Sequence, residues 1–274
     1  MLADLECNAG NLEAGFELQG RARRHAQTFG HGGFVRWLTG ERVGEWYWTG
    51  AWDLAVDAAD SSIAEAEAGT PNFMQGYCHA MRGRIRLGRG DRVGALNDAD
   101  QAIAFARSAE DPQTLYPALA FGARAQVLVG SLDTGAVLAD ELLGLWRSNL
   151  RTYPASAWAV DLAYALEALG RGSQLAETAS SVAMRTRWLE AVVSYATGDH
   201  QQAAERFGRI GSRPDEALAH LRAGQMLLNN GRERDARAVL DRALAFLHEV
   251  DAKAYLVNAE SLGRTSLVID TFTT

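Results

Sequence analysis

The sequence has little cysteine and no long apolar run. Its two cysteines, Cys7 and Cys78, are too few for a disulfide framework or a cysteine metal site. No apolar run of about 18 residues could span a bilayer. The N-terminus also lacks the charged and apolar segments of a secretion signal. We therefore expect a cytoplasmic protein with no membrane contact, no metal and no other cofactor.

Motifs that carry catalytic chemistry are also missing. The sequence has no G-x-S-x-G nucleophile elbow, no H-E-x-x-H and no G-x-x-x-x-G-K-[ST] phosphate loop. A net charge of −7 argues against a broad nucleic-acid or anionic-membrane surface. Three arginines of the run 82–92 share one helix face and could contact phosphate, but Asp91, Asp98 and Asp100 can balance them. We expect no enzyme and no direct nucleic-acid partner.

Glycine, in contrast, recurs at a fixed spacing. Five glycines lie forty residues apart, and two more follow at steps of 28 and 33: Gly10, Gly50, Gly90, Gly130, Gly170, Gly198 and Gly231. Small residues recur seven positions before and five positions after most of them. A period of roughly 20–50 residues indicates stacked copies of one supersecondary unit. Glycine can take the positive φ that ends a helix and reverses the chain.

The flanks of each glycine have helical periodicity and helix-start signals. Thr70 and Asp111 each precede a proline, which suits the first turn of a helix. No stretch alternates apolar and polar residues as a strand would. The predicted helix pairs are 31–48 with 51–68, 73–89 with 91–109, 112–129 with 133–149, 155–169 with 173–182, 184–197 with 200–210, and 214–230 with 233–248. Residues 1–7 and 11–29 form an incomplete first pair, and a last helix covers about 251–268.

The sequence therefore predicts an all-α protein: a right-handed α-solenoid of about seven helical hairpins. Residues 1–274 form one repeat domain, with a possible seam near 170–184, where the period changes. Because the sequence begins inside an amphipathic pattern, we expect either a piece of a longer protein or an incomplete first repeat.

The pattern around each glycine resembles the tetratricopeptide repeat. Three units carry the closest match: Gly83, Gly90, Ala95 and Ala102; Ala191, Gly198, Ala203 and Phe207; and Gly224, Gly231, Ala236 and Ala243. The segments 80–119 and 214–262 are similar to the C-terminal repeats of bacterial multidomain signalling ATPases. In such regulators the repeats accompany adenylate-cyclase-like domains, or DNA-binding domains as in LuxR-type and maltose-regulon activators. The resemblance implies an interaction module whose catalytic and DNA-binding parts lie outside these residues.

The same resemblance implies that ligands bind the inner wall formed by the first helix of each hairpin. The predicted groove residues are Trp37, Tyr47, Trp48, Tyr77, Arg84, Arg124, Tyr164, Trp188, Tyr195 and Gln225. Arg84 and Arg124 occupy equivalent places in adjacent units, and paired guanidinium groups suit a carboxylate or phosphate.

These observations favour a non-enzymatic module of a bacterial signalling or transcription regulator. It would bind a protein or peptide segment, or a small effector, on its concave face. The alternative is a structural scaffold that mediates homo-oligomerisation, for example as a homodimer. A third reading is an enzyme with a pocket near 170–188; a deep pocket there with converging titratable groups would favour it.

Overall fold

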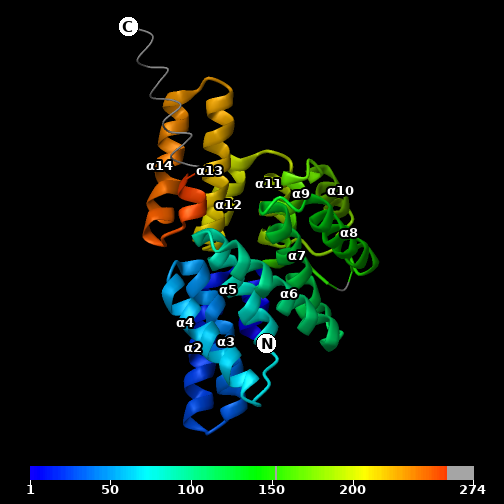
Figure 1. The fold of residues 1–274 in the computed structure, drawn as a ribbon, viewed down its shortest axis with the longest axis vertical. Helices are drawn as coiled ribbons and strands as arrows, with labels where there is room; N and C mark the ends of the chain where they lie inside the picture. The colour runs from blue at the N-terminus through cyan, green and yellow to red at the C-terminus, as the bar shows by residue number, and fades with distance from the viewer. Residues whose placement is uncertain (152, 258–274) are drawn as a thin grey trace.

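The computed structural model describes residues 1–151 and 153–257, and this part of the chain is helical with no strands. The helices are α1 (Leu2–Ala9), α2 (Leu12–Thr28), α3 (Gly32–Thr49), α4 (Trp52–Glu67), α5 (Gln75–Arg89), α6 (Arg92–Ala109), α7 (Pro112–Leu128), α8 (Leu132–Ser148), α9 (Trp158–Ala168), α10 (Gly172–Ser180), α11 (Arg187–Ala196), α12 (His200–Ile210), α13 (Arg213–Asn229) and α14 (Glu233–Glu249). Residues 253–257 are helical as well. The all-α prediction is confirmed (Figure 1).

The glycine series marks the turn of each helical hairpin, as the sequence predicts. All seven glycines have a positive φ, between 70° and 95°. At Gly90, the amide of the glycine donates to the carbonyl of Leu87, and the next amide donates to the carbonyl of Arg86. These two bonds use carbonyls that the end of α5 would otherwise leave unpaired. The turn therefore needs a residue that tolerates the left-handed conformation.

Small residues let the two helices of a hairpin approach closely. A Cβ added to Gly135 on α8 would lie 2.5 Å from the side chain of Val127 and 3.0 Å from the carbonyl oxygen of Ala123, both on α7. Ala123 itself is fully buried. The recurring small residues around each turn are thus a requirement of backbone packing.

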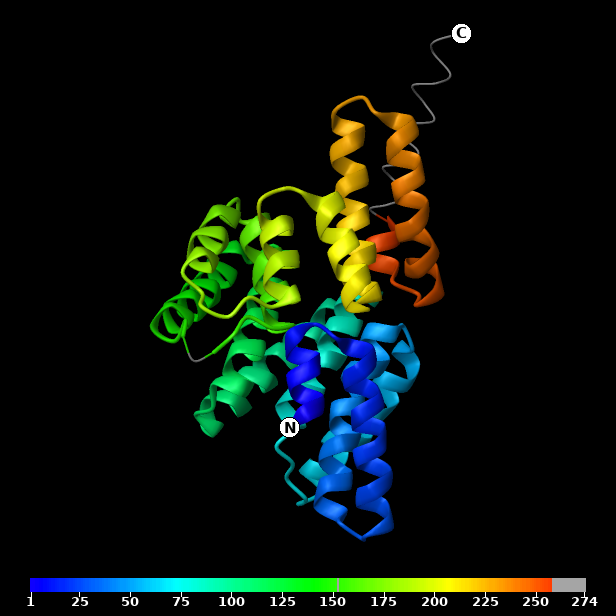
Figure 2. The same cartoon turned by 180° about the vertical axis from the view of Figure 1, so that it is seen from behind.

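Successive hairpins pack side by side through their first helices. Contacts join α3 to α5, α5 to α7, α7 to α9 and α9 to α11. The last hairpin then packs on the second, because α13 contacts α3, and the first packs on the sixth, because α1 contacts α11. Figures 1 and 2 show α13 and α14 stacked against the end of the blue N-terminal helices. The helices of the two ends therefore meet.

Aromatic side chains fill the place where these ends meet. The indole N–H of Trp188 donates to the carbonyl of Cys7 over 2.8 Å, and its ring lies 6.1 Å from that of Trp48. On the other side, the rings of Trp52 and Phe246 meet edge to face at 6.0 Å. These contacts join residues 140 to 194 positions apart, which the repeat pattern alone does not predict.

The helix boundaries differ from the expected ones near the seam. The structure starts α9 at Trp158 and α11 at Arg187, each three residues later than predicted. Thr186 explains the second difference: its hydroxyl accepts from the amide of Leu189 and donates to the carbonyl of Ala155 over 2.6 Å. This cap fixes the helix start and holds the 181–186 connection. The expected helix 251–268 lies outside the described residues beyond 257.

A carboxyl group on α3 makes stability depend on pH. Burial, and then the charge of Asp4, raise the pKa of Glu41 to about 7. A carboxyl whose pKa is higher in the folded state favours folding while protonated, so this contribution is complete at low pH and is lost as pH rises toward 7. We expect Glu41→Gln to remove about 2–3 kcal/mol of the fall in unfolding free energy between about pH 4.5 and pH 8.

Urea unfolding at several pH values measures this effect. Glu17→Gln on α2 is the matched control, because Glu17 is exposed, and it should leave the pH profile unchanged. An identical pH profile for Glu41→Gln and the unsubstituted protein would contradict the assignment.

Candidate functional site

Three charged side chains meet at the centre of the molecule. Arg84 on α5 and Arg124 on α7 both donate to Asp161 on α9, with 2.7 Å between Arg84 Nε and Asp161 Oδ2 and 2.7 Å between Arg124 Nη1 and Asp161 Oδ1. The exposed fractions of the three residues are 7%, 4% and 2%. Both arginines lie six positions before their turn glycines. Because α5, α7 and α9 are neighbours, equivalent positions become spatial neighbours.

The two arginines at this centre outnumber the ionised carboxylates that face them. Burial alone would raise the pKa of Asp161, but Arg84 and Arg124 overcome it and hold that pKa below its usual value. The nearby Asp215 on α13 has the opposite behaviour, because burial raises its pKa more than Ser212 and Arg124 lower it. Two guanidinium groups thus face one firmly ionised carboxylate, beside a second carboxyl that burial drives toward its neutral form.

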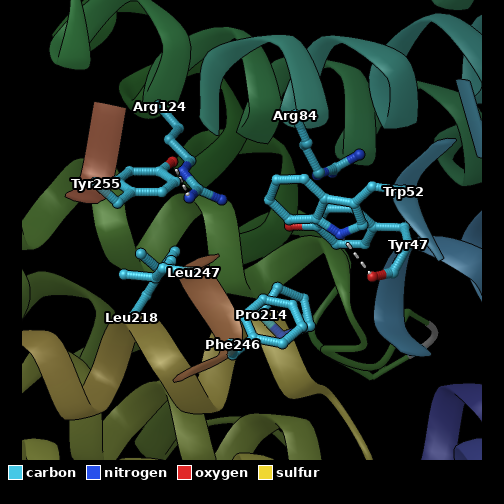
Figure 3. Close-up of a pocket in the computed structure, with 9 residues that line it drawn as sticks. All are labelled: Tyr47, Trp52, Arg84, Arg124, Pro214, Leu218, Phe246, Leu247 and Tyr255. Atoms are coloured by element: carbon cyan, nitrogen blue, oxygen red, sulfur yellow. Dashed lines mark hydrogen bonds between the residues drawn. The ribbon is translucent and has the colours of Figure 1, made fainter. Parts of the chain in front are cut away.

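A pocket opens next to the arginines (Figure 3). Its cavity volume is about 10 Å³, roughly the space of one water molecule. Its lining residues are Tyr47, Trp52, Arg84, Arg124, Pro214, Leu218, Phe246, Leu247 and Tyr255. The arginines lie on one side and residues of α13 and α14 on the other. The pocket therefore lies where the last hairpin packs against α3, α4, α5 and α7.

Hydrogen bonds and ring contacts order the pocket wall. The indole N–H of Trp52 donates to the carbonyl of Tyr47 over 3.0 Å, and the two rings stack at 5.8 Å. Arg124 Nη2 donates to the hydroxyl of Tyr255 over 2.9 Å. Arg124 Nε is buried and has no hydrogen-bond partner among the described residues. Aromatic walls with two cationic donors suit an anion, such as a carboxylate, that carries an apolar group.

The structure divides the predicted groove residues between several places. Tyr47, Arg84 and Arg124 line the pocket. Tyr164 lies under the guanidinium of Arg124 at 4.5 Å, and the Tyr195 ring lies 4.6 Å from the Tyr164 ring.

The other predicted groove residues lie away from the pocket. Trp48 and Trp188 pack on each other. A Cβ on Gly44 would touch the Tyr77 hydroxyl, which places Tyr77 between α3 and α5. Trp37 packs on Phe34. Gln225 accepts from Arg222 on the same helix.

Burial differs from the open inner wall that the sequence predicts. Seven of the ten predicted groove residues are buried: Tyr47, Trp48, Arg84, Arg124, Tyr164, Trp188 and Tyr195. The physical reason is that helices distant in the chain pack on these residues. Residues of α13 and α14 lie against Tyr47 and the two arginines, whereas Trp188 packs on Trp48 and bonds to α1. The equivalence of Arg84 and Arg124 holds, but they share Asp161 instead of facing a wide groove.

Sequence reasoning missed several residues of the site. Asp161 could have been found, because it is a single acidic residue in an otherwise apolar stretch from Trp158 to Leu166. Phe246, Leu247 and Tyr255 carry no such signal. They reach the pocket only through a contact between distant ends of the chain.

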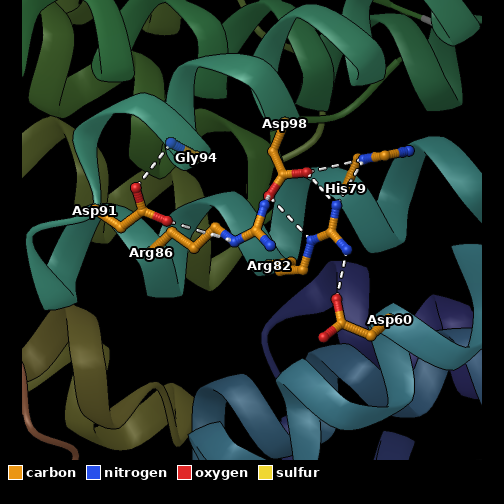
Figure 4. A network of polar contacts seen from close by, with 7 residues as sticks. All are labelled: Asp60, His79, Arg82, Arg86, Asp91, Gly94 and Asp98. Atoms are coloured by element: carbon orange, nitrogen blue, oxygen red, sulfur yellow. Dashed lines mark hydrogen bonds and ion pairs between the residues drawn. The ribbon is translucent and has the colours of Figure 1, made fainter.

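A second polar network, shown in Figure 4, accounts for the basic run on α5. Asp98 on α6 is fully buried and accepts from Arg82 and Arg86, the latter over 2.9 Å. His79 Nδ1 lies 2.9 Å from the same carboxylate, and Arg82 also reaches Asp60 on α4. The expected balance of these arginines by acidic side chains is confirmed for Asp98. The network joins three helices, so we infer that its role is to stabilise the fold.

Comparison with known proteins adds no family to these observations. No protein-family model matches the chain, and no curated protein is significantly similar to it. Among the described residues, no group of three or more His, Cys, Asp or Glu side chains could hold a metal ion. In the same part of the chain, every helix is too short or too polar to cross a bilayer.

Proposed function

We propose that this chain is a tetratricopeptide-like right-handed α-solenoid whose two ends close on each other, and that it is a non-enzymatic, cytoplasmic binding module of a bacterial signalling or transcription regulator. Its ligand carries a carboxylate and an aromatic or other apolar group, and it binds between the arginines and the last hairpin, where the side chains that line the small pocket move apart to admit it. A small organic acid and the C-terminus of a peptide share this chemistry. The regular helical hairpins and positive-φ glycines support the architecture.

The convergence of Arg84 and Arg124 on one pocket carries the ligand proposal. A buried guanidinium is costly without a partner for its charge and its N–H groups. Here Asp161 ionises fully and neutralises one arginine, while Arg124 Nε stays unpaired. A ligand carboxylate would supply the missing negative charge. The aromatic and aliphatic side chains opposite the arginines would hold its apolar group.

Signalling would follow from the position of the pocket between the two ends. A ligand that contacts α5 and α7 as well as α13 and α14 binds only when these helices are together. It therefore stabilises the closed arrangement by its difference in affinity for closed and open forms. Homo-oligomerisation through the inner wall is less well supported, because the chain's own helices cover this wall.

Calorimetric titration with matched small ligands tests the proposal. N-acetyl-phenylalanine and 3-phenylpropionate represent a peptide end and an organic acid, and N-acetyl-phenylalanine amide lacks only the carboxylate. We expect the acids to bind with dissociation constants of about 1 mM or lower, and the amide to bind at least about tenfold more weakly.

Two tryptophan substitutions on α13 test whether the acids bind in the pocket or elsewhere on this helix. Leu218→Trp fills the pocket and should abolish binding of the acids. Met226→Trp is the control, because Met226 is 39% exposed and lies outside the pocket, and it should leave binding unchanged. Equal binding of acid and amide, or no heat from either acid at about 10 mM, would overturn the carboxylate site.

A further inference from the structure

The turn between α2 and α3 carries a positive, aromatic surface on an otherwise acidic protein. Residues 18–40 contain four arginines and two histidines but no aspartate or glutamate, whereas the whole chain has a net charge of −7. Figures 1 and 2 show this turn projecting at the lower end of the molecule, far from the C-terminal hairpin. We call the surface formed by Arg21, Arg24, Phe29, Phe34 and Arg36 the α2–α3 tip.

The arginines of the tip are free, in contrast to those of α5. Arg21, Arg24 and Arg36 are exposed. Within the described residues, none of the three forms an ion pair or a side-chain hydrogen bond with an acidic group. On α5, Arg82 and Arg84 are both paired with buried carboxylates. Ion pairs within the fold thus account for the arginines of α5, but no such pairs account for the arginines of the α2–α3 tip.

Large aromatic side chains are also exposed at this turn. Phe29 and Phe34 are 62% and 57% exposed. Phe29 packs on His25 with 4.6 Å between ring centroids, and Phe34 packs on Trp37 at 5.5 Å. Folding gains little from phenyl rings left in water, and exposed aromatic groups next to arginine are typical of the energetic centre of protein interfaces.

We propose that the α2–α3 tip docks an acidic amphipathic helix of a partner protein. Carboxylates of that helix would pair with Arg21, Arg24 and Arg36, since guanidinium groups bind carboxylates through two parallel hydrogen bonds. Its apolar stripe would cover Phe29 and Phe34. This site does not depend on the central pocket.

The surroundings of the tip favour a short acidic segment over nucleic acid or an anionic membrane. Those partners present long arrays of negative charge and need broad basic surfaces. Here the basic surface ends within one helix, because Glu13 and Glu17 are exposed at the start of α2. A long polyanion would meet these carboxylates, whereas a helix of a few turns fits within the tip.

Fluorescence anisotropy with a designed peptide tests the proposal. The probe is a helical peptide of about 18 residues with Leu and Phe along one face and Glu on the other. A second peptide carries Gln in place of every Glu. We expect the acidic peptide to bind with a dissociation constant below about 100 µM and the Gln peptide to bind at least about tenfold more weakly.

Two sets of substitutions separate charge from aromatic contact. The triple variant Arg21→Gln, Arg24→Gln, Arg36→Gln and the double variant Phe29→Ser, Phe34→Ser should each weaken binding of the acidic peptide by at least about tenfold. The matched control is Arg234→Gln, Arg237→Gln, Arg242→Gln, which removes three exposed arginines from α14. It should change binding less than about twofold. Circular dichroism verifies that all variants keep their helices.

Three results would overturn the proposal. The first is no binding of the acidic peptide at about 1 mM. The second is binding that the control triple variant weakens as much as the tip variants do. The third is tighter binding of phosphatidylserine vesicles or oligo(dT) than of the acidic peptide, which would assign the tip to a membrane or to nucleic acid.

Discussion

Asp161→Asn is expected to lower the free energy of unfolding by about 3–5 kcal/mol, because it leaves two buried guanidinium groups without their shared counter-charge. Asparagine has nearly the same shape as aspartate, so the loss reports charge and not volume. Arg84 and Arg124 are 7% and 4% exposed, and water cannot readily replace the carboxylate. Chemical denaturation at neutral pH measures the difference.

Two further variants test whether the lost charge of Asp161 causes the fall in the free energy of unfolding. Asp140→Asn breaks an ion pair with Arg171, but Asp140 is 58% exposed at its side chain, so we expect a loss of at most about 1 kcal/mol. The triple variant Arg84→Met, Arg124→Met, Asp161→Leu replaces the whole cluster with apolar groups and should recover most of the lost stability. If Asp161→Asn lowered the free energy of unfolding by less than about 1 kcal/mol, the two arginines would not depend on the Asp161 carboxylate as their buried counter-charge.

Retention of a costly cluster at the centre of the molecule is informative about function. A core of this kind would be as stable, or more stable, with apolar side chains in place of the three charged ones. The arginines also face the pocket, where Arg124 already donates to Tyr255. We infer that the cluster is kept for recognition, with Asp161 orienting both guanidinium groups toward a ligand. The cost to stability and the proposed binding of an anion would then have the same origin.

The local features of the fold could be predicted from the sequence because they depend on local chemistry. A glycine that must take a positive φ has its effect within a few residues, and so do capping side chains and helical periodicity. Hence the turns at Gly50 and Gly130 are where the spacing places them. The equivalence of Arg84 and Arg124 also follows, since side-by-side stacking turns a repeat in sequence into a neighbour relation in space.

The closure of the chain could not be predicted in the same way. It depends on the small rotation between successive hairpins, which accumulates along the array and leaves no periodic signal. Phe246 and Trp52 meet where the last hairpin packs on the second. The exposure of the predicted wall could not be predicted for the same reason. Tyr164 and Tyr195 belong to that wall, but they are buried. Repeat spacing therefore predicted that Arg84 and Arg124 are neighbours, but it did not indicate whether solvent reaches them.

Trp188→Ala is expected to lower the free energy of unfolding by about 3–5 kcal/mol and also to release α1. Trp188 is fully buried, and it contacts Trp48 and Phe207 while donating to the carbonyl of Cys7. Truncation to alanine leaves a cavity where α1, α3 and α11 meet. The milder Trp188→Phe keeps most of the packing and loses the hydrogen bond, so we expect a loss of only about 1–2 kcal/mol.

Trp146→Ala is the matched control, since Trp146 is equally buried but packs on Trp158 inside the array. Both alanine variants remove the same volume, so both should lose similar stability. Only Trp188→Ala should speed amide hydrogen exchange in residues 2–9, because only Trp188 bonds to α1. Equal exchange of α1 in the two variants would contradict the closure. Faster exchange confined to Trp188→Ala would mean that specific side-chain contacts hold α1 against α11.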